Sequence, residues 1–162
     1  MNTVFIADDE LIIRQGIKCI IDWEQLGFEI IGEASNGVDA LNFILNKQPD
    51  LVLMDIRMPK MLGLDVVEAA RNKGFNGKVI ILSGYTDFKY AQTAIKNGVD
   101  YYLTKPIDED ELYETVDSIR SQISKEAEDK ETLSTYRDKA KSMILFDILT
   151  GTSTINNIDD MN

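Results

Sequence analysis

Residues 51–59 read LVLMDIRMP, in which the unbroken apolar run from Leu51 to Met54 is followed directly by Asp55. Four consecutive apolar residues are typical of a strand that is buried on both faces of a parallel sheet. The carboxylate of Asp55 should therefore lie at the end of a buried strand and be partly buried itself. Because a buried charge needs a partner, Asp55 is the first candidate for a functional residue.

Similar β-rich runs occur on both sides of this strand, at residues 3–7, 29–34, 78–82 and 100–104. The stretches between them repeat apolar residues at helical spacing, as Ile13, Ile17 and Ile20 do in the first of them. Alternating strands and helices of this length predict an α/β fold, in which helices cover both faces of a parallel sheet. Five such units fill residues 1 to about 120.

A long helical pattern follows from Asp108, with no proline or glycine before Gly151. Its apolar residues first have the 4-3-4 spacing of a packed helix: Leu112, Val116, Ile119 and Ile123. The stripe lapses at residues 125–131 and then resumes, slightly shifted: Leu133, Tyr136, Ala140, Met143 and Ile144. We expect a domain over residues 1–123, a helical connector over 124–150 and a flexible or truncated tail over 151–162. A single solvated helix is the alternative for the connector.

Composition excludes several classes of function. The 162 residues include no histidine, which removes Ser-His-Asp and Cys-His catalysis and HExxH zinc sites. The formal net charge is -11, and residues 108–162 alone carry 14 acidic and 6 basic residues, so this chain is not expected to bind nucleic acid. Cys19 is the single cysteine, which fits a reducing cytoplasm, and no apolar run is long enough to predict a membrane span.

Polar side chains follow four of the predicted strands. They are Asp8, Asp9 and Glu10 after the first, Asp55 after the third, Ser83 after the fourth and Lys105 after the fifth. Ligands of such sheets bind beyond the carboxyl ends of the strands, where these groups meet. Alone, each has an ordinary interpretation as a helix cap, a turn or a solvated loop. Together they predict a site.

The charges of that site favour a cation. Asp8, Asp9 and Asp55 carry three negative charges and Lys105 one positive charge, so the group must take up protons or bind a metal. Oxygen ligands in small number suit Mg²⁺, which often works together with phosphate. An aspartate is a competent nucleophile for phosphoryl transfer, and Lys105 and the Ser83 hydroxyl would then contact the phosphoryl oxygens.

Four motifs resemble the receiver domain of two-component response regulators: ADDE at residues 7–10, LMDIRMP at 53–59, LSGY at 82–85 and LTKP at 103–106. The resemblance covers residues 3 to about 122. It implies a flavodoxin-like, doubly wound (βα)5 fold with strand order 2-1-3-4-5, here with an extended C-terminal helix.

The resemblance also assigns roles to individual residues. Asp55 would be the phosphoacceptor, and Asp8, Asp9, Asp55 and the backbone carbonyl of Arg57 would hold Mg²⁺. Lys105 would bind phosphate and precede a cis proline. Ser83 and Tyr102 would be the switch residues, which change the face made by the fourth helix, fifth strand and fifth helix.

A finer resemblance is to the receivers of AraC-type transcriptional regulators, carried by DWE at residues 22–24, LGF at 26–28, GEASNG at 32–37 and SGYTDF at 83–88. In that class a linker and a C-terminal helix-turn-helix region follow. No basic recognition helix is present here, so DNA binding is expected only in a longer parent protein. The implied partners are a sensor histidine kinase and, after phosphorylation, a second copy of the chain. A cytoplasmic location is expected, without a membrane partner.

This hypothesis makes the chain a phosphorylation-controlled switch and not a turnover enzyme. An aspartate-nucleophile phosphatase is one alternative, although such enzymes usually carry a second aspartate where this chain has Arg57. A flavodoxin-like FMN-binding protein is another, although Asp8, Asp9 and Glu10 would repel the FMN phosphate. A degenerate receiver that only mediates contacts is a third.

Overall fold

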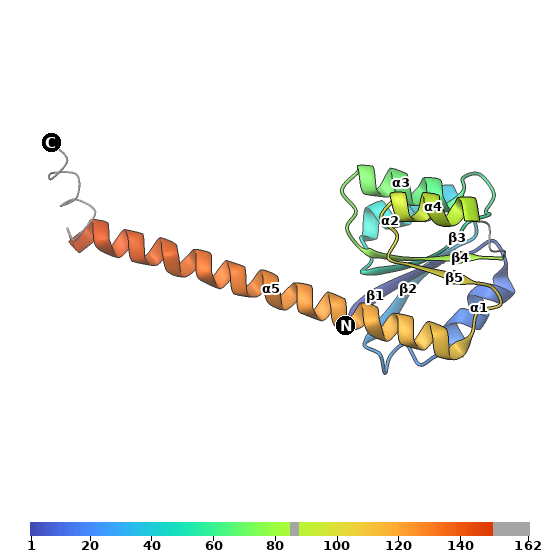
Figure 1. Cartoon of the computed structure of the whole chain (residues 1–162), viewed down its shortest axis with the longest axis horizontal. Helices are drawn as coiled ribbons and strands as arrows, with labels where there is room; N and C mark the ends of the chain where they lie inside the picture. The colour runs from blue at the N-terminus through green and yellow to red at the C-terminus, as the bar shows by residue number, and fades with distance from the viewer. Residues whose placement is uncertain (85–87, 151–162) are drawn as a thin grey trace. The chain divides into compact units, whose positions relative to one another are not determined.

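A five-stranded parallel sheet in the order β2-β1-β3-β4-β5 forms the centre of the computed structural model (Figure 1). The strands are β1 (Asn2–Ala7), β2 (Phe28–Ala34), β3 (Leu51–Asp55), β4 (Lys78–Ser83) and β5 (Tyr101–Thr104). The helices are α1 (Leu11–Ile20), α2 (Gly37–Lys47), α3 (Gly63–Asn72), α4 (Phe88–Lys96) and α5 (Glu109–Thr150). The predicted fold and strand order are confirmed, and every strand agrees with its predicted range to within one residue at each end.

The structure describes residues 1–84 and 88–150, without the side chains of residues 88–91, 134, 142 and 144–150. The predicted tail over residues 151–162 lies outside the described residues, as do Tyr85, Thr86 and Asp87 of the SGYTDF motif and the side chain of Ile144. No helix in the described part of the chain is both long enough and apolar enough to cross a membrane.

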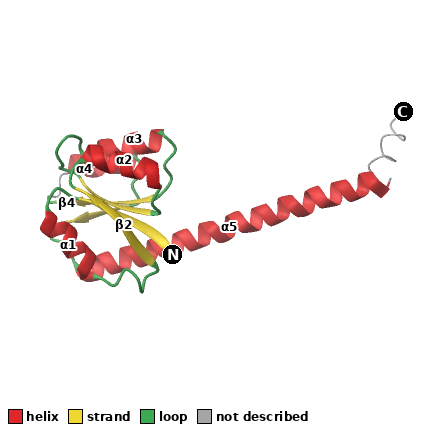
Figure 2. Cartoon of the chain, turned by 180° about the vertical axis from the view of Figure 1, so that it is seen from behind, coloured by secondary structure: helices red, strands yellow, loops and turns green. Residues whose placement is uncertain are grey.

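Two helical layers cover the sheet. Helices α2, α3 and α4 lie on one face, and α1 with the beginning of α5 lies on the other (Figures 1 and 2). Side chains of a strand alternate between its faces, so β3 sends Val52 and Met54 into the core under α2 and α3. Its other residues, Leu51 and Leu53, are also fully buried. This explains why the strand is apolar at every position before Asp55.

The chain divides into two compact units, Met1–Arg120 and Ser121–Asn162. In the first unit, the predicted stripe of α5 is buried at Leu112, Val116 and Ile119. In the second unit, the side chains of Leu133, Tyr136 and Met143 are 58%, 68% and 68% exposed. The resumed stripe therefore has no partner within its own unit, as far as the structure describes that unit.

Candidate functional site

Asp8 lies at the end of β1, fully buried, and each of its polar atoms has a partner. Its backbone N–H donates to the carbonyl of Ala34 (3.1 Å), and its own carbonyl accepts from Nη1 of Arg14 (2.7 Å). Oδ1 accepts from the backbone N–H of Glu10 (2.9 Å), and Oδ2 accepts from Nζ of Lys105 (2.7 Å). This many bonds fix the carboxylate firmly at the edge of the sheet.

Asp8, Asp9 and Glu10 form a carboxylate cluster, with one oxygen of each within 4.8 Å of the others. Asp8 is buried, whereas Asp9 and Glu10 are exposed, so the cluster opens to solvent. An all-oxygen donor set on a half-open loop fits Mg²⁺, which keeps several of its waters. The chemistry of these residues thus agrees with the predicted metal, and Glu10 joins the group although it was not among the predicted ligands.

Lys105 connects this cluster to Asp55. Its Nζ lies 2.7 Å from Oδ2 of Asp8 and 3.4 Å from Oδ1 of Asp55. Asp55 is the last residue of β3 and is only 5% exposed, as the apolar run before it predicted. Residues 8, 55 and 105, far apart in sequence, therefore form one cluster, in which Lys105 supplies a positive charge between two buried carboxylates.

Burial and neighbouring charges shift the pKa values of Asp55 and Lys105. Burial raises the pKa of Asp55 to about 6, and the negative charge of Asp8 adds to this effect, although Lys105 opposes it. Burial by itself lowers the pKa of Lys105, but its hydrogen bond to Asp8 and the charge of Asp55 raise it on balance. A carboxylate cluster that is short of positive charge has the electrostatic character of a cation site.

Ser83 and Tyr102 come from the two neighbouring strands. Ser83 ends β4 and is 5% exposed, and its carbonyl accepts from the backbone N–H of Lys105 (2.6 Å). The predicted cis peptide between Lys105 and Pro106 is present. Tyr102 packs against the core with its hydroxyl oxygen buried, and no described residue gives that oxygen a hydrogen-bond partner.

The loop between β3 and α3 brings Gly63 close to the backbone of Asp55. Gly63, the first residue of α3, donates from its backbone N–H to the carbonyl of Ile56 (2.7 Å). A Cβ at Gly63 would lie only 1.9 Å from the carbonyl oxygen of Asp55, so no other residue fits. Arg57 lies in this loop, two residues after Asp55, and its side chain is exposed.

Sequence reasoning missed two residues that shape this site. Gly63 resembles any glycine before a helix, and only the close approach to Asp55 reveals its role. Arg14 resembles a solvated residue of α1, yet its side chain is 11% exposed and contacts the loop of Asp8.

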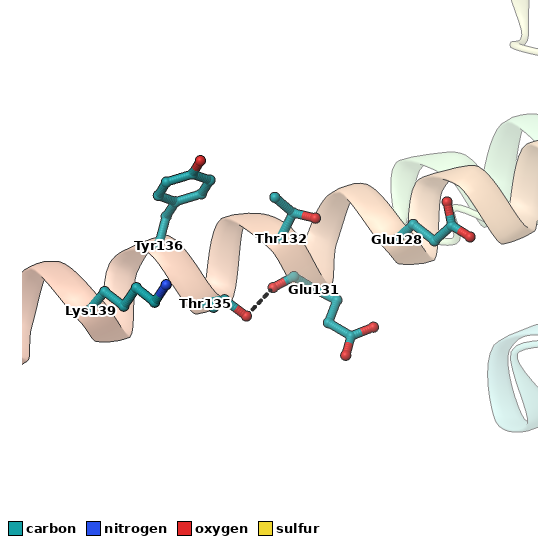
Figure 3. A pocket seen from close by; sticks show the side chains of 6 residues that line it. All are labelled: Glu128, Glu131, Thr132, Thr135, Tyr136 and Lys139. Carbon is teal, nitrogen blue, oxygen red and sulfur yellow. Dashed lines mark hydrogen bonds between the residues drawn. The ribbon is translucent and has the colours of Figure 1, made fainter.

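Hollows also lie on other parts of the described surface. One, of about 550 Å³, runs along α5 and is lined by Glu128, Glu131, Thr132, Thr135, Tyr136 and Lys139 (Figure 3). All six belong to one helix, and Tyr136 and Glu131 point to opposite sides of it, so their side chains do not converge on a ligand. The hydroxyl of Thr135 donates to the carbonyl of Glu131 (3.0 Å).

Another hollow, of about 380 Å³, has Lys105 among its lining residues. It is mainly apolar and is lined by Ile12, Ile13, Gly16, Ile17, Cys19, Ile20, Lys105, Pro106 and Ile107. Ile12 is 74% exposed. Lys105 thus lines this hollow and also contacts Asp8 and Asp55.

The sequence of this chain is similar to those of known proteins. Residues 4–117 match the response regulator receiver domain family. The chain is 38% identical over 126 residues to the uncharacterized transcriptional regulatory protein YesN of Bacillus subtilis, which covers 78% of this chain and 34% of that protein. It is 46% identical over 112 residues to the transcriptional regulatory protein HptR of Staphylococcus aureus, which covers 69% of this chain and 44% of that protein.

Solved structures of response regulator domains are similar to this chain in fold. The REC domain of AraT, a response regulator from Geobacillus stearothermophilus, superposes with a TM-score of 0.73 and 42% identity, covering 77% of this chain and 97% of that one. A CheY-like response regulator receiver domain protein from Methanospirillum hungatei superposes with a TM-score of 0.70 and 28% identity. The match covers 78% of this chain and 98% of that one. This chain spans less than half the length of the two curated relatives described above.

Proposed function

The chain belongs to the response regulator receiver domain family, and on this premise we propose that Asp55 accepts a phosphoryl group from a sensor histidine kinase. Receivers of this family are regulatory domains of phosphorylation-dependent signalling. The observation that carries the proposal is the bridge from Lys105 to both Asp8 and Asp55, because it joins an acidic cation site, a buried carboxylate and an ammonium in one pocket.

The proposed reaction is a phosphoryl transfer between two side chains. A carboxylate oxygen of Asp55 attacks phosphorus, the phosphorus–nitrogen bond to the kinase histidine breaks, and an acyl phosphate forms. The released imidazole takes up a proton. With a pKa of about 6, Asp55 is mainly ionised at pH 7, as a nucleophile must be. Lys105 and Ser83 are placed to contact the phosphoryl oxygens.

Mg²⁺ is the proposed cofactor. Asp8, Asp9, Asp55 and the backbone carbonyl of Arg57 would hold it, with Glu10 at the exposed rim of the cluster. When bound, Mg²⁺ neutralises charge on the transferring phosphoryl group. The protein's own part is to keep Asp8 in place through its four hydrogen bonds and to keep Asp55 shielded from bulk water.

A small phosphodonor tests the proposal without a kinase. Incubation with acetyl phosphate and Mg²⁺ is expected to add one phosphoryl group per chain, and peptide mass spectrometry should place it on Asp55. Omitting Mg²⁺ should reduce labelling strongly, because the negative donor would then meet an uncompensated acidic pocket. Labelling at another residue would contradict the assignment. Rapid, continuing hydrolysis of an added phosphomonoester would favour the phosphatase alternative instead.

The apolar hollow beside Lys105 supports the proposed partner. We infer that it receives the histidine-bearing segment of the kinase, because Lys105, which contacts both Asp8 and Asp55, is among its lining residues. Covering an exposed isoleucine such as Ile12 removes apolar surface from water, which would stabilise the complex with the partner. We also propose a cytoplasmic location for this chain, as expected from its sequence, because the kinase domain must meet it there.

The proposed output is a change at α4, β5 and α5 that favours a dimer. Residues 1–123 would act as the receiver and residues 124–150 as the connector, whose exposed Leu133, Tyr136 and Met143 would be covered by a second copy. DNA would be contacted only through a further domain of a longer parent protein. Light scattering of the phosphorylated sample should then give a higher molar mass than that of the untreated protein.

Tyr102, the proposed switch aromatic, offers a test of its inward position. Its hydroxyl is buried without a hydrogen-bond partner among the described residues, and such a group costs roughly 1–3 kcal/mol. Tyr102→Phe removes only that hydroxyl, so it is expected to stabilise the inward side chain and raise the unfolding free energy by about 1 kcal/mol. Urea denaturation measures the change. A loss of stability would contradict the inward, unsatisfied position of the hydroxyl.

A further inference from the structure

Arg14 lies in the second turn of α1, and its guanidinium is nearly withdrawn from solvent. The side chain is 11% exposed. Nη1 donates to the carbonyl of Asp8 (2.7 Å), and Nε donates to Oε1 of Glu33 on β2 (3.0 Å). Because the N–H groups of a guanidinium form a rigid, planar fork, two bonds in different directions fix its orientation.

The carbonyl of Asp8 is a critical point of the backbone. Before it, the chain is held in the sheet by the bond from the N–H of Asp8 to Ala34. After it, the chain leaves the sheet and turns through Asp9 and Glu10 into α1. Asp8 is fully buried, so its carbonyl would lose its hydrogen bond without Arg14, and the turn would relax to recover one.

Glu33 orients Arg14 from the neighbouring strand. Lys18, one helical turn after Arg14, forms an ion pair with the same carboxylate. Lys18 thus has the same helix, charge and acidic partner as Arg14, but the structure gives it no hydrogen bond to Asp8. The difference between the two residues isolates the contact with the acidic loop.

We propose that Arg14, oriented by Glu33, is a positioning residue that holds the loop of Asp8, Asp9 and Glu10 in the shape that binds a divalent cation. The inference rests on the metal site of the proposed function. The expected effect of removing Arg14 on cation affinity is opposite to the effect that its charge alone would have. Removing a positive charge near a cation site should tighten cation binding, whereas removing a support for the ligand loop should weaken it.

The test uses Mn²⁺ as the probe and electron paramagnetic resonance to measure free Mn²⁺ in a titration of the full chain. Arg14→Gln is expected to weaken Mn²⁺ binding about tenfold, as is typical when a residue supporting metal ligands is lost. Lys18→Gln is the matched control and should stay within about twofold of wild type, because the structure gives Lys18 no hydrogen bond to Asp8 and its side chain is more exposed than that of Arg14, 35% against 11%. Hydrogen exchange at the amides of Asp9 and Glu10 should also become faster in Arg14→Gln only.

The outcomes separate the two proposals. Mn²⁺ binding by Arg14→Gln that equals or exceeds that of wild type would overturn the positioning role. Absence of Mn²⁺ binding by the wild-type chain itself would instead overturn the metal site of the proposed function. If Arg14→Gln fails to fold, Arg14→Lys keeps the charge but cannot reproduce the fork, and it should still bind more weakly. Wild-type affinity in that variant would also overturn the proposal.

Discussion

Asp55→Asn is expected to abolish phosphorylation by acetyl phosphate and, at the same time, to stabilise the metal-free protein. The loss of labelling follows because an amide is not a nucleophile for phosphorus. The gain in stability follows because Asn has no charge to bury, whereas Asp55 ionises inside a pocket that already contains the charge of Asp8.

The pH dependence of that gain has a definite sign. Burial raises the pKa of Asp55 from 3.8 to about 6, so the folded state binds the proton more tightly than the unfolded state. The stability contributed by protonated Asp55 is complete below pH 3.8 and is lost as the pH rises through about 6. The advantage of Asp55→Asn should therefore grow between pH 4 and pH 7. A shift of this size corresponds to at most about 3 kcal/mol, and we expect roughly 1–2 kcal/mol after solvent screening.

Thermal unfolding of both proteins at several pH values, without Mg²⁺, measures this difference, and we expect a rise in Tm of about 5 °C at pH 7. Asp50→Asn is a matched control, because Asp50 directly precedes β3, at the end opposite Asp55, and accepts from the backbone N–H of Thr3 (2.8 Å). It should leave labelling intact. Wild-type labelling of Asp55→Asn would disprove the phosphoacceptor assignment, and a lower Tm at pH 7 would contradict the buried charge.

Gly63→Ala should cause the largest loss of stability among the substitutions considered. The added Cβ would lie 1.9 Å from the carbonyl oxygen and 2.9 Å from the carbonyl carbon of Asp55, and these are backbone atoms that cannot rotate away. The β3–α3 loop or the end of β3 must shift. We expect a loss of about 3 kcal/mol or more, as for severe overpacking of a core.

Gly16→Ala is the control for Gly63→Ala. Gly16 lies in the middle of α1, and nothing lies within 4 Å of a Cβ built there. The same added methyl group should therefore stabilise the chain by about 0.5–1 kcal/mol through helix propensity. Urea denaturation of the two variants should give changes of opposite sign. Equal stability of Gly63→Ala and wild type would contradict the close contact with Asp55.

The sequence predicted most of the fold because the strands of a doubly wound sheet have a strong apolar pattern. β3 is buried at every position, and its run of Leu51 to Met54 is visible without any structure. The sequence also predicted which strand ends face one another, because parallel strands bring their carboxyl ends to one edge. The placement of Asp8, Asp55 and Lys105 in one pocket followed from that rule.

The sequence could not predict contacts that depend on distance rather than on pattern. Nothing in the spacing of residues distinguishes Arg14, which contacts the carbonyl of Asp8, from Lys18, which does not. The contact of Gly63 with Asp55 depends on how tightly the β3–α3 loop closes. The sequence also did not predict that Lys105 contacts Asp8 as well as Asp55. Its ammonium lies closer to Asp8 than to Asp55.

In the proposed function, that pairing would make Lys105 an internal competitor for the cation site. The ammonium donates to Oδ2 of Asp8, and the carboxylate of Asp8 would also be needed to hold the divalent cation. The affinity for Mg²⁺ would then be what remains after this ammonium has been displaced. Displacement would also free Lys105 to contact a phosphoryl group on Asp55. Metal affinity and readiness for phosphate would therefore depend on the same residue, so a substitution of Lys105 would alter both.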